Sequence, residues 1–318
     1  MRVAALDLGS NTFLLLIAEV AEDPNYTSGP LQVKEILCDE TQVVRLAQDV
    51  DKTGRFHPEA LKRAELCLLN YRQIIDQYRV DEVRAVATSA ARDASNKEQF
   101  FSLGDRFHIP IRVIEGSLEA ALTFRGATEG GASGKAQVVI DVGGGSTEVI
   151  GQSSFGESSG AETGVKGHSF DVGSVRLTER FISKHPVPLE ELQAMQSFIK
   201  EEFERGRGFL PQGPIDEVVA VAGTPTTLAC LKMQRDYSED FVHGCQLSLD
   251  EMSEWLTRLA SLSIEQREAL VGMPAKRADV LVAGLAILMG ATKALGQSQV
   301  TVSTRGVRYG LATMREWG

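Results

Sequence analysis

A glycine-rich turn between two short apolar runs carries the residues best suited to chemistry. The apolar run 138–140 ends in Asp141, and three glycines and two hydroxyl residues then lead to Glu148 and a second apolar pair. The apolar flanks predict two short strands joined by a tight turn. Glycine lets a backbone approach a ligand closely, and successive N–H groups in such a turn form an anion-binding nest. The predicted phosphate-binding residues of this turn are Gly143, Gly144, Gly145, Ser146 and Thr147.

The two carboxylates at the ends of this turn indicate a metal ion. Asp141 and Glu148 would repel a bound phosphate unless a hard cation lay between them. Mg²⁺ is such a cation, because one or two carboxylates and the substrate phosphates commonly hold it. We therefore expect Asp141 and Glu148 to hold Mg²⁺ or Mn²⁺. Taken alone, the turn is equally consistent with a hairpin capped by polar residues, because a glycine motif without context is weak.

Two further turns supply that context. Near the N-terminus an apolar run again ends in an aspartate, Asp7, followed by the polar turn 9–11. A third turn, 223–224, follows the apolar run 218–222 and opens a helix, whose first N–H groups can bind phosphate. The two hairpins predict a duplicated domain with a phosphate site in the cleft between the halves. The further predicted phosphate-binding residues are Asp7, Gly9, Ser10, Asn11, Gly223 and Thr224.

Predicted strands and helices alternate along the chain, and this alternation predicts an α/β fold that positions the turns. In the first half we expect strands over 2–8, 13–20, 31–38, 41–46, 83–87 and 111–114, with a helix over 58–78. In the second half we expect the hairpin 138–150, a polar loop over 151–167, strands over 218–222 and 299–303, and helices between them. The Gly- and Ser-rich stretch 126–135 predicts a boundary between an N-terminal domain, 1–126, and a C-terminal domain, 127–318. The last helix, about 305–318, is able to pack back on the first domain.

The bulk composition argues against a membrane protein. A length of 318 residues favours two domains, and 43% of the residues are hydrophobic. The longest apolar stretch, 280–291, contains two glycines and is shorter than the roughly 20 residues that a transmembrane helix needs. Asp7 interrupts the first apolar run, so we expect no signal peptide and a cytoplasmic location. The four cysteines form no C-x-x-C pair and are expected to be reduced.

The net charge of −10 argues against a nucleic-acid partner, which would need a basic patch. The negative net charge would repel a polyanionic substrate unless local arginines and a metal ion opposed it. Arg92 follows a predicted strand, where open α/β sheets bind ligands. The five histidines are scattered, which disfavours a zinc site. The residues that could form a local basic patch are Lys276, Arg277, Arg305 and Arg308.

Glu119 lies in the first turn of a helix that follows the strand 111–114. By itself this position favours a simple interaction with the helix dipole, without catalysis.

End to end, the sequence resembles the exopolyphosphatase/guanosine-pentaphosphate phosphohydrolase (Ppx/GppA) family in its short two-domain form. The resemblance rests on residues 7–11, 87–94, 141–148, 173–179, 223–228 and 277–284. It implies two duplicated actin-like, ribonuclease H-like domains of the superfamily of actin, sugar kinases and heat-shock ATPases (ASKHA), around a central phosphate-binding cleft.

The resemblance also implies roles for particular residues. Glu119 corresponds to the general base for the attacking water, and Arg92 to a residue on the substrate phosphates. Asp141 and Glu148 correspond to positions near Mg²⁺ or Mn²⁺. The family often has Glu-Glu-Ala-Arg around the catalytic acid, whereas Ala121 takes the place of the arginine here.

The leading hypothesis is an exopolyphosphatase that removes the terminal phosphate of inorganic polyphosphate. Phosphoryl transfer needs alignment and charge neutralisation of the phosphate, which the turns, Arg92 and a metal would supply. Hydrolysis of guanosine pentaphosphate would use the same site, and an actin-like kinase would need an adenosine pocket and an acceptor site. A sensor that binds polyphosphate or an alarmone without turnover is the non-enzymatic alternative, against which Glu119 counts. We expect a homodimer without nucleic-acid or membrane partners.

Overall fold

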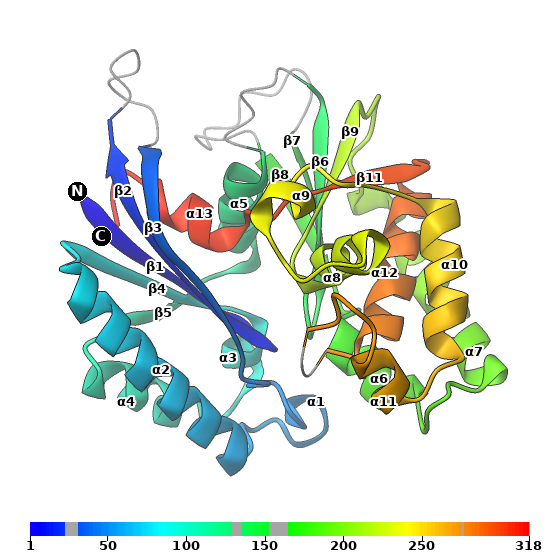
Figure 1. Ribbon diagram of the computed structural model, residues 1–318, viewed down its shortest axis with the longest axis horizontal. Coiled ribbons are helices and arrows are strands. Elements are labelled where there is room, and N and C mark those ends of the chain that lie inside the picture. The colour runs from blue at the N-terminus through cyan, green and yellow to red at the C-terminus, as the bar shows by residue number, and fades with distance from the viewer. Residues whose placement is uncertain (23–30, 129–134, 153–164, 275–276, 318) are drawn as a thin grey trace. The chain divides into compact units, whose positions relative to one another are not determined.

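The structure is a computed structural model that describes residues 1–22, 31–128, 135–152, 165–274 and 277–317. The chain forms two compact units (Figure 1). The first unit comprises Met1–Gly126 and Val307–Gly318, and the second comprises Ala127–Gly306. Each unit is built on one mixed β-sheet with helices packed against it.

The sheet of the first unit has the strand order β3-β2-β1-β4-β5. Its strands are β1 (Arg2–Leu8), β2 (Thr12–Ala21), β3 (Gln32–Val43), β4 (Glu82–Ala87) and β5 (Ile111–Val113). The first three strands are antiparallel to one another, β4 is parallel to β1, and β5 is parallel to β4. The parallel strands β1, β4 and β5 therefore bring their carboxyl ends, and the turns that follow them, to one edge of the sheet.

The helices of the first unit cover both faces of this sheet. They are α1 (Val50–Thr53), α2 (Pro58–Tyr78), α3 (Ser89–Asp93), α4 (Glu98–Arg106), α5 (Gly116–Ala127) and α13 (Val307–Ala312). Helices α2 and α4 lie on one face (Figure 1). Tyr71 of α2 and Phe100 of α4 belong to the same buried cluster as Leu6 and Phe13 of the sheet. Side chains of α5 and α13 pack on the other face against the alternate residues of β1. The predicted helix 58–78 is confirmed, with Pro58 at its first turn and His57 Nδ1 accepting from the Glu59 N–H at 3.1 Å.

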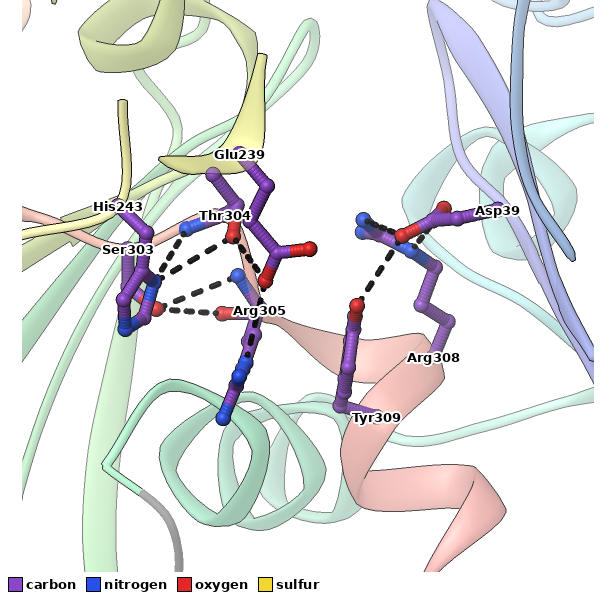
Figure 2. A network of polar contacts seen from close by, with 8 residues as sticks. All are labelled: Asp39, Glu239, His243, Ser303, Thr304, Arg305, Arg308 and Tyr309. Atoms are coloured by element: carbon purple, nitrogen blue, oxygen red, sulfur yellow. Dashed lines mark hydrogen bonds and ion pairs between the residues drawn. The ribbon is translucent and has the colours of Figure 1, made fainter. Parts of the chain in front are cut away.

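Two arginine side chains fasten the C-terminal segment to the first sheet. Arg84 of β4 is 1% exposed, and its Nη1 donates to the carbonyls of Leu311, Ala312 and Met314. It thereby satisfies carbonyl groups at the end of α13 that have no helical partner. Arg308 donates two hydrogen bonds, of 3.0 and 2.9 Å, to the carboxylate of Asp39 on β3 (Figure 2).

The sheet of the second unit repeats the first. Its order is β10-β11-β9-β6-β7-β8, so five of its strands run β8-β7-β6-β9-β11 as β3-β2-β1-β4-β5 do in the first unit. The strands are β6 (Gln137–Val142), β7 (Thr147–Gln152), β8 (Val165–Phe170), β9 (Glu217–Val221), β10 (Gln246–Ser248) and β11 (Gln299–Val302). Their directions also agree, since β6, β7 and β8 are antiparallel neighbours while β9 and β11 continue parallel to β6. The expected α/β fold and the expected duplication of its strand pattern are confirmed.

The helices of the second unit surround one large apolar core. They are α6 (Ser174–Phe181), α7 (Leu189–Arg205), the 3₁₀ turn η2 (Arg207–Phe209), α8 (Gly223–Met233), α9 (Glu239–Val242), α10 (Leu249–Ala260), α11 (Ile264–Glu268) and α12 (Leu281–Ala294). Apolar α12 is buried nearly all round, and Gly290 lets α7 approach it, because a Cβ there would lie 2.5 Å from Ile199 Cγ2. None of the helices in the described ranges has both the length and the apolar character to cross a membrane.

Two expected elements differ from the structure. The strands predicted over 31–38 and 41–46 are one strand, β3, and the chain then leaves the sheet because the N–H groups of Val44 and Arg45 bind the Asn11 carbonyl. The polar loop predicted over 151–167 is shorter, because β7 continues to Gln152 and β8 begins at Val165. Residues 153–164 of that loop, and 129–134 of the predicted boundary, lie outside the described residues.

Candidate active site

The two predicted phosphate turns that follow β1 and β6 have the same backbone geometry. The Gly9 N–H donates to the Thr12 carbonyl at 3.1 Å, and the Gly143 N–H donates to the Ser146 carbonyl at 3.0 Å. A Cβ added to either glycine would lie 3.0 Å from that carbonyl oxygen. Each turn therefore needs glycine at its first position, and the two turns are structural copies of each other.

Neighbouring segments anchor both turns by their carbonyl groups. Gly144 O accepts from the N–H groups of Val175 and Arg176 at the start of α6, at 2.9 and 3.1 Å. Gly173 lies so close that a Cβ there would be 2.3 Å from Gly144 O. In the first unit, Ser10 O accepts from the Ala47 N–H at 2.9 Å. Each turn is thus held rigidly from its carbonyl side.

The N–H groups of the same turns are left for a ligand. Within the described residues, the backbone N–H groups of Ser10, Asn11, Gly144, Gly145 and Ser146 donate to no other group. Neighbouring N–H groups without internal acceptors form the concave sites that bind phosphate oxygens. The geometry therefore agrees with the phosphate-binding role that the sequence predicts for these five residues.

The predicted metal ligands lie opposite each other on adjacent strands. Asp141 of β6 faces Glu148 of β7 in the strand register, so both side chains lie on one face of the sheet. Glu148 is only 4% exposed, and its Oε1 accepts hydrogen bonds from Ser146 Oγ at 2.7 Å and Ser169 Oγ at 2.6 Å. Two carboxylates placed opposite each other repel unless a cation compensates them, and hard oxygen ligands suit Mg²⁺ or Mn²⁺. The pair fits such an ion, although the described part of the chain holds no cluster of three or more His, Cys, Asp and Glu side chains suited to a metal.

The side chain of Thr147 is engaged within the second unit. It is fully buried, and its hydroxyl donates to the Val172 carbonyl at 2.5 Å. The hydroxyl therefore holds the start of β7 to the segment before α6. The sequence could not show this contact, because it joins residues 25 positions apart.

The turn that follows β9 brings an arginine to the start of α8. The Arg277 guanidinium takes the place of a side chain at Gly223, where a Cβ would lie 1.2 Å from Nη1. Burial lowers the pKa of Arg277 to about 10, so the guanidinium remains charged at neutral pH. Thr224 is buried against α12, since a Cβ on Gly284 would lie 2.3 Å from Thr224 Oγ1. The predicted phosphate turn at Gly223 and the predicted basic residue Arg277 therefore lie side by side in the second unit.

Ala222, immediately before α8, has a backbone conformation that glycine normally adopts, with φ 73° and ψ −166°. Such a conformation costs on the order of 1–3 kcal/mol for a residue with a Cβ. We expect Ala222→Gly to leave the melting temperature unchanged or to raise it, because the strain is released. Ala229→Gly, in the interior of the same helix, should lower it as expected for a cost of roughly 0.5–1 kcal/mol. Equal destabilisation of both variants in thermal unfolding would contradict a strained Ala222.

The other members of the predicted basic patch have acidic partners within their own units. In the second unit, Arg305 Nε lies 3.5 Å from Glu239 Oε1, to which Thr304 also donates at 3.3 Å (Figure 2). In the first unit, Arg308 makes the bidentate contact with Asp39. Lys276 lies outside the described residues. Arg305 and Arg308 are therefore compensated charges, and a phosphate would have to compete with a carboxylate for either.

The two predicted catalytic residues lie together in the first unit. Arg92, in the last turn of α3, places Nη1 3.1 Å from Glu119 Oε2 in the first turn of α5. The same Nη1 donates to the Ile114 carbonyl at 2.7 Å, which fixes the guanidinium at the end of β5. Glu119 is 8% exposed, a degree of burial that is rare for a glutamate without a function or a partner.

Sequence reasoning missed two hydroxyl residues of these turns. Ser89, at the start of α3, lies 2.9 Å from Ser10 between their Oγ atoms and joins the β1–β2 turn to the helix that carries Arg92. Ser169 binds Glu148 from β8, a strand that the sequence did not predict. Ser89 lies within the segment 87–94 that carries the family resemblance, but its contact with Ser10, like that of Ser169 with Glu148, depends on packing between residues far apart in the sequence.

Comparisons with known proteins agree on one family. The model of the Ppx/GppA phosphatase family matches residues 27–315 of this chain. Exopolyphosphatase 2 of Mycobacterium tuberculosis is 36% identical over 323 residues, which cover 98% of this chain and 97% of that protein. Among solved structures, an exopolyphosphatase-like protein matches with a TM-score of 0.85 and 29% identity, covering 98% of this chain and 96% of its own. An exopolyphosphatase from Cytophaga hutchinsonii matches with a TM-score of 0.79 and 27% identity, at the same coverage of 98% and 96%.

The family match spans most of the chain, and the M. tuberculosis relative is matched over nearly its full length. The repeated strand order and the repeated turns agree with the duplication that the sequence led us to expect, and Arg92 and Glu119, to which the resemblance gives roles, lie 3.1 Å apart. This chain belongs to the Ppx/GppA phosphatase family.

Proposed function

We propose that this protein is an exopolyphosphatase, which hydrolyses the terminal phosphoanhydride of inorganic polyphosphate and releases orthophosphate. The observation that carries the proposal is the buried Glu119 beside Arg92, because a sensor without turnover has no need of a carboxylate held in this way. The similarity to Exopolyphosphatase 2 supports the choice of substrate.

In the proposed reaction, Glu119 accepts a proton from a water molecule as the water oxygen bonds to the terminal phosphorus. The anhydride P–O bond breaks, the shortened chain leaves with the bridging oxygen, and orthophosphate is released. General-base assistance of this kind suits a carboxylate held in place by a neighbouring group. Arg92 holds the Glu119 carboxylate through Nη1, and in the described residues its Nε and Nη2 have no acceptor, so they suit phosphate oxygens.

Within each unit, the phosphate turns supply backbone N–H groups in this proposal. The N–H groups of Ser10 and Asn11 in one unit, and of residues 144–146 in the other, bind phosphate oxygens. The Gly223 turn, with Arg277 against it, adds a cationic contact. We propose that Asp7 belongs to the phosphate site of the first turn, since it stands two residues before Gly9 as Asp141 stands before Gly143.

In general, phosphatases of this kind depend on a metal ion. We propose that Asp141 and Glu148 hold Mg²⁺ or Mn²⁺, which would neutralise negative charge on the phosphates when bound. The hydroxyls of Ser146 and Ser169 both donate to Oε1 of Glu148 and hold that oxygen in place. We also propose a cytoplasmic homodimer, in keeping with the expectation from the sequence.

Hydrolysis of the 5′-terminal phosphate of guanosine pentaphosphate is the rival function, because the family name covers both activities. The test is phosphate release measured side by side on short polyphosphate, long polyphosphate, guanosine pentaphosphate and ATP, without any acceptor. We expect the highest kcat/KM on polyphosphate. A preference for guanosine pentaphosphate would replace the proposed substrate, and phosphate transfer that needs an acceptor would indicate a kinase.

Arg92→Ala should lower kcat/KM on polyphosphate by about 10–100-fold, because a hydrogen bond to a charged group contributes about 1.5–3 kcal/mol. Arg72→Ala is the matched control. Its side chain is 22% exposed, against 24% for Arg92, and it pairs with Asp76 on the outer side of α2. The measurement is steady-state phosphate release by both variants, with melting temperatures. Wild-type kcat/KM in Arg92→Ala would show that Arg92 only supports the fold.

A further inference from the structure

We propose that Ser169 is a positioning residue for the metal-binding carboxylate of Glu148. The inference rests on the metal assignment in the proposed function and extends it to a residue that neither the motifs nor the family resemblance pointed to. The link from Ser169 to the site is its hydrogen bond to Glu148.

A row of three side chains across three strands carries the inference. Asp141 of β6 is opposite Glu148 of β7, and Glu148 is opposite Ser169 of β8. Residues opposite each other on antiparallel strands project from the same face of the sheet. The row therefore places a hydroxyl on the far side of Glu148 from Asp141, in line with the two carboxylates.

The hydrogen bonds show what the hydroxyl does. Ser169 Oγ donates to Glu148 Oε1 at 2.6 Å, and Ser146 Oγ donates to the same oxygen at 2.7 Å. Hydroxyl–carboxylate bonds of this length are charge-assisted and stronger than bonds between neutral groups. Both hydroxyls donate to Oε1, so two hydrogen bonds to one oxygen hold the Glu148 carboxylate in one orientation.

A role in folding explains this contact less well than a role in orientation. Ser169 is exposed, whereas Glu148 is 4% exposed, and β8 is held to β7 by its backbone register whatever side chain stands at 169. An exposed hydroxyl contributes little apolar burial, so its removal should leave the fold intact. Groups that hydrogen-bond to a metal ligand instead tune the affinity for the metal, typically by about 10–100-fold.

The test compares wild-type protein, Ser169→Ala, Ser169→Thr and Thr301→Val. The main readout is the dissociation constant for Mn²⁺, from the electron paramagnetic resonance signal of free Mn²⁺ during titration, together with the melting temperature. We expect Ser169→Ala to raise the dissociation constant about 10–100-fold. Ser169→Thr keeps the hydroxyl on a strand position that suits threonine and should restore wild-type affinity.

Thr301→Val is the matched control, because Thr301 Oγ1 donates to the carboxylate of Glu217 at 3.0 Å in the same sheet, on β11 and β9. It removes a hydroxyl–carboxylate bond of the same kind away from the row and should leave Mn²⁺ affinity unchanged. Unchanged affinity in Ser169→Ala, or an equal loss in the control, would overturn the proposal. If wild-type protein binds no Mn²⁺, the metal assignment fails together with the role of Ser169. If Mn²⁺ binding depends on Ser169 but no phosphate is released from polyphosphate, the role stands and the proposed function fails.

Discussion

Glu119→Gln is expected to lower kcat on polyphosphate by about 10²–10⁴-fold while substrate binding is retained. Glutamine keeps the size of glutamate and an oxygen that can accept from Arg92 Nη1, which lies 3.1 Å from Glu119 Oε2. It cannot accept the proton of the attacking water, so only the chemical step should suffer. The measurement is kcat from phosphate release, with the Kd for polyphosphate and the melting temperature on the same preparation.

A simple interaction with the helix dipole predicts a different result. In that case Glu119→Gln would cost only about 0.3–1 kcal/mol of stability and would leave turnover nearly intact. Glu98→Gln supplies the matched control, because Glu98 lies in the first turn of α4 in the same unit and has no proposed catalytic role. Turnover of the Glu119 variant within a few-fold of wild type would mean that another residue activates the water.

Removal of divalent cations should abolish hydrolysis, and Mg²⁺ or Mn²⁺ should restore it. Metal ions contribute several kcal/mol to the stabilisation of charge on phosphoryl groups, so we expect a rate loss of at least about 100-fold in excess chelator. Asp141→Asn should raise the metal concentration needed for half-maximal activity, because one of the two opposed carboxylates is then neutral. The measurement is phosphate release against metal concentration.

Asp216→Asn is the control for that variant, since Asp216 is an exposed carboxylate that accepts from the Ala136 N–H at 2.9 Å, just before β6. It should show the wild-type dependence on metal. Full activity of the wild-type protein in excess chelator would contradict the proposal that a metal ion takes part. Unchanged metal dependence in Asp141→Asn would place the ion on other residues.

The turns of the site could be predicted from the sequence because their signals are local. A buried strand that ends in Asp7 or Asp141, followed by Gly9 or Gly143, specifies the hairpin within about ten residues, and the structure shows the same turn twice. The two hairpins predicted a duplicated domain, and the two sheets do share one strand order over five strands, although the sequence did not predict that order. Glu119 and Arg92, in contrast, needed the family resemblance, because their 3.1 Å contact joins two helices.

Contacts set by strand register and tertiary packing could not be predicted. Ser169 faces Glu148 only because β8 pairs with β7 in one register, and no motif within β8 reports that register. The hydrogen bond from the buried hydroxyl of Thr147 to the Val172 carbonyl could not be predicted for the same reason. Arg84 looks like any strand arginine in the sequence, yet its guanidinium is buried beneath α13, from the other end of the chain. Such contacts depend on long-range packing, which overrides local propensity.

Product analysis on a polyphosphate of defined length tests the central claim most directly. Wild-type protein and Glu119→Gln would each be incubated with the chain and Mg²⁺, and the products resolved by ³¹P NMR and gel electrophoresis over time. If the chain is an exopolyphosphatase with Glu119 as general base, wild-type protein releases orthophosphate one residue at a time from the chain end, and the variant releases almost none. Internal fragments without orthophosphate, or equal release by the two proteins, would contradict the account.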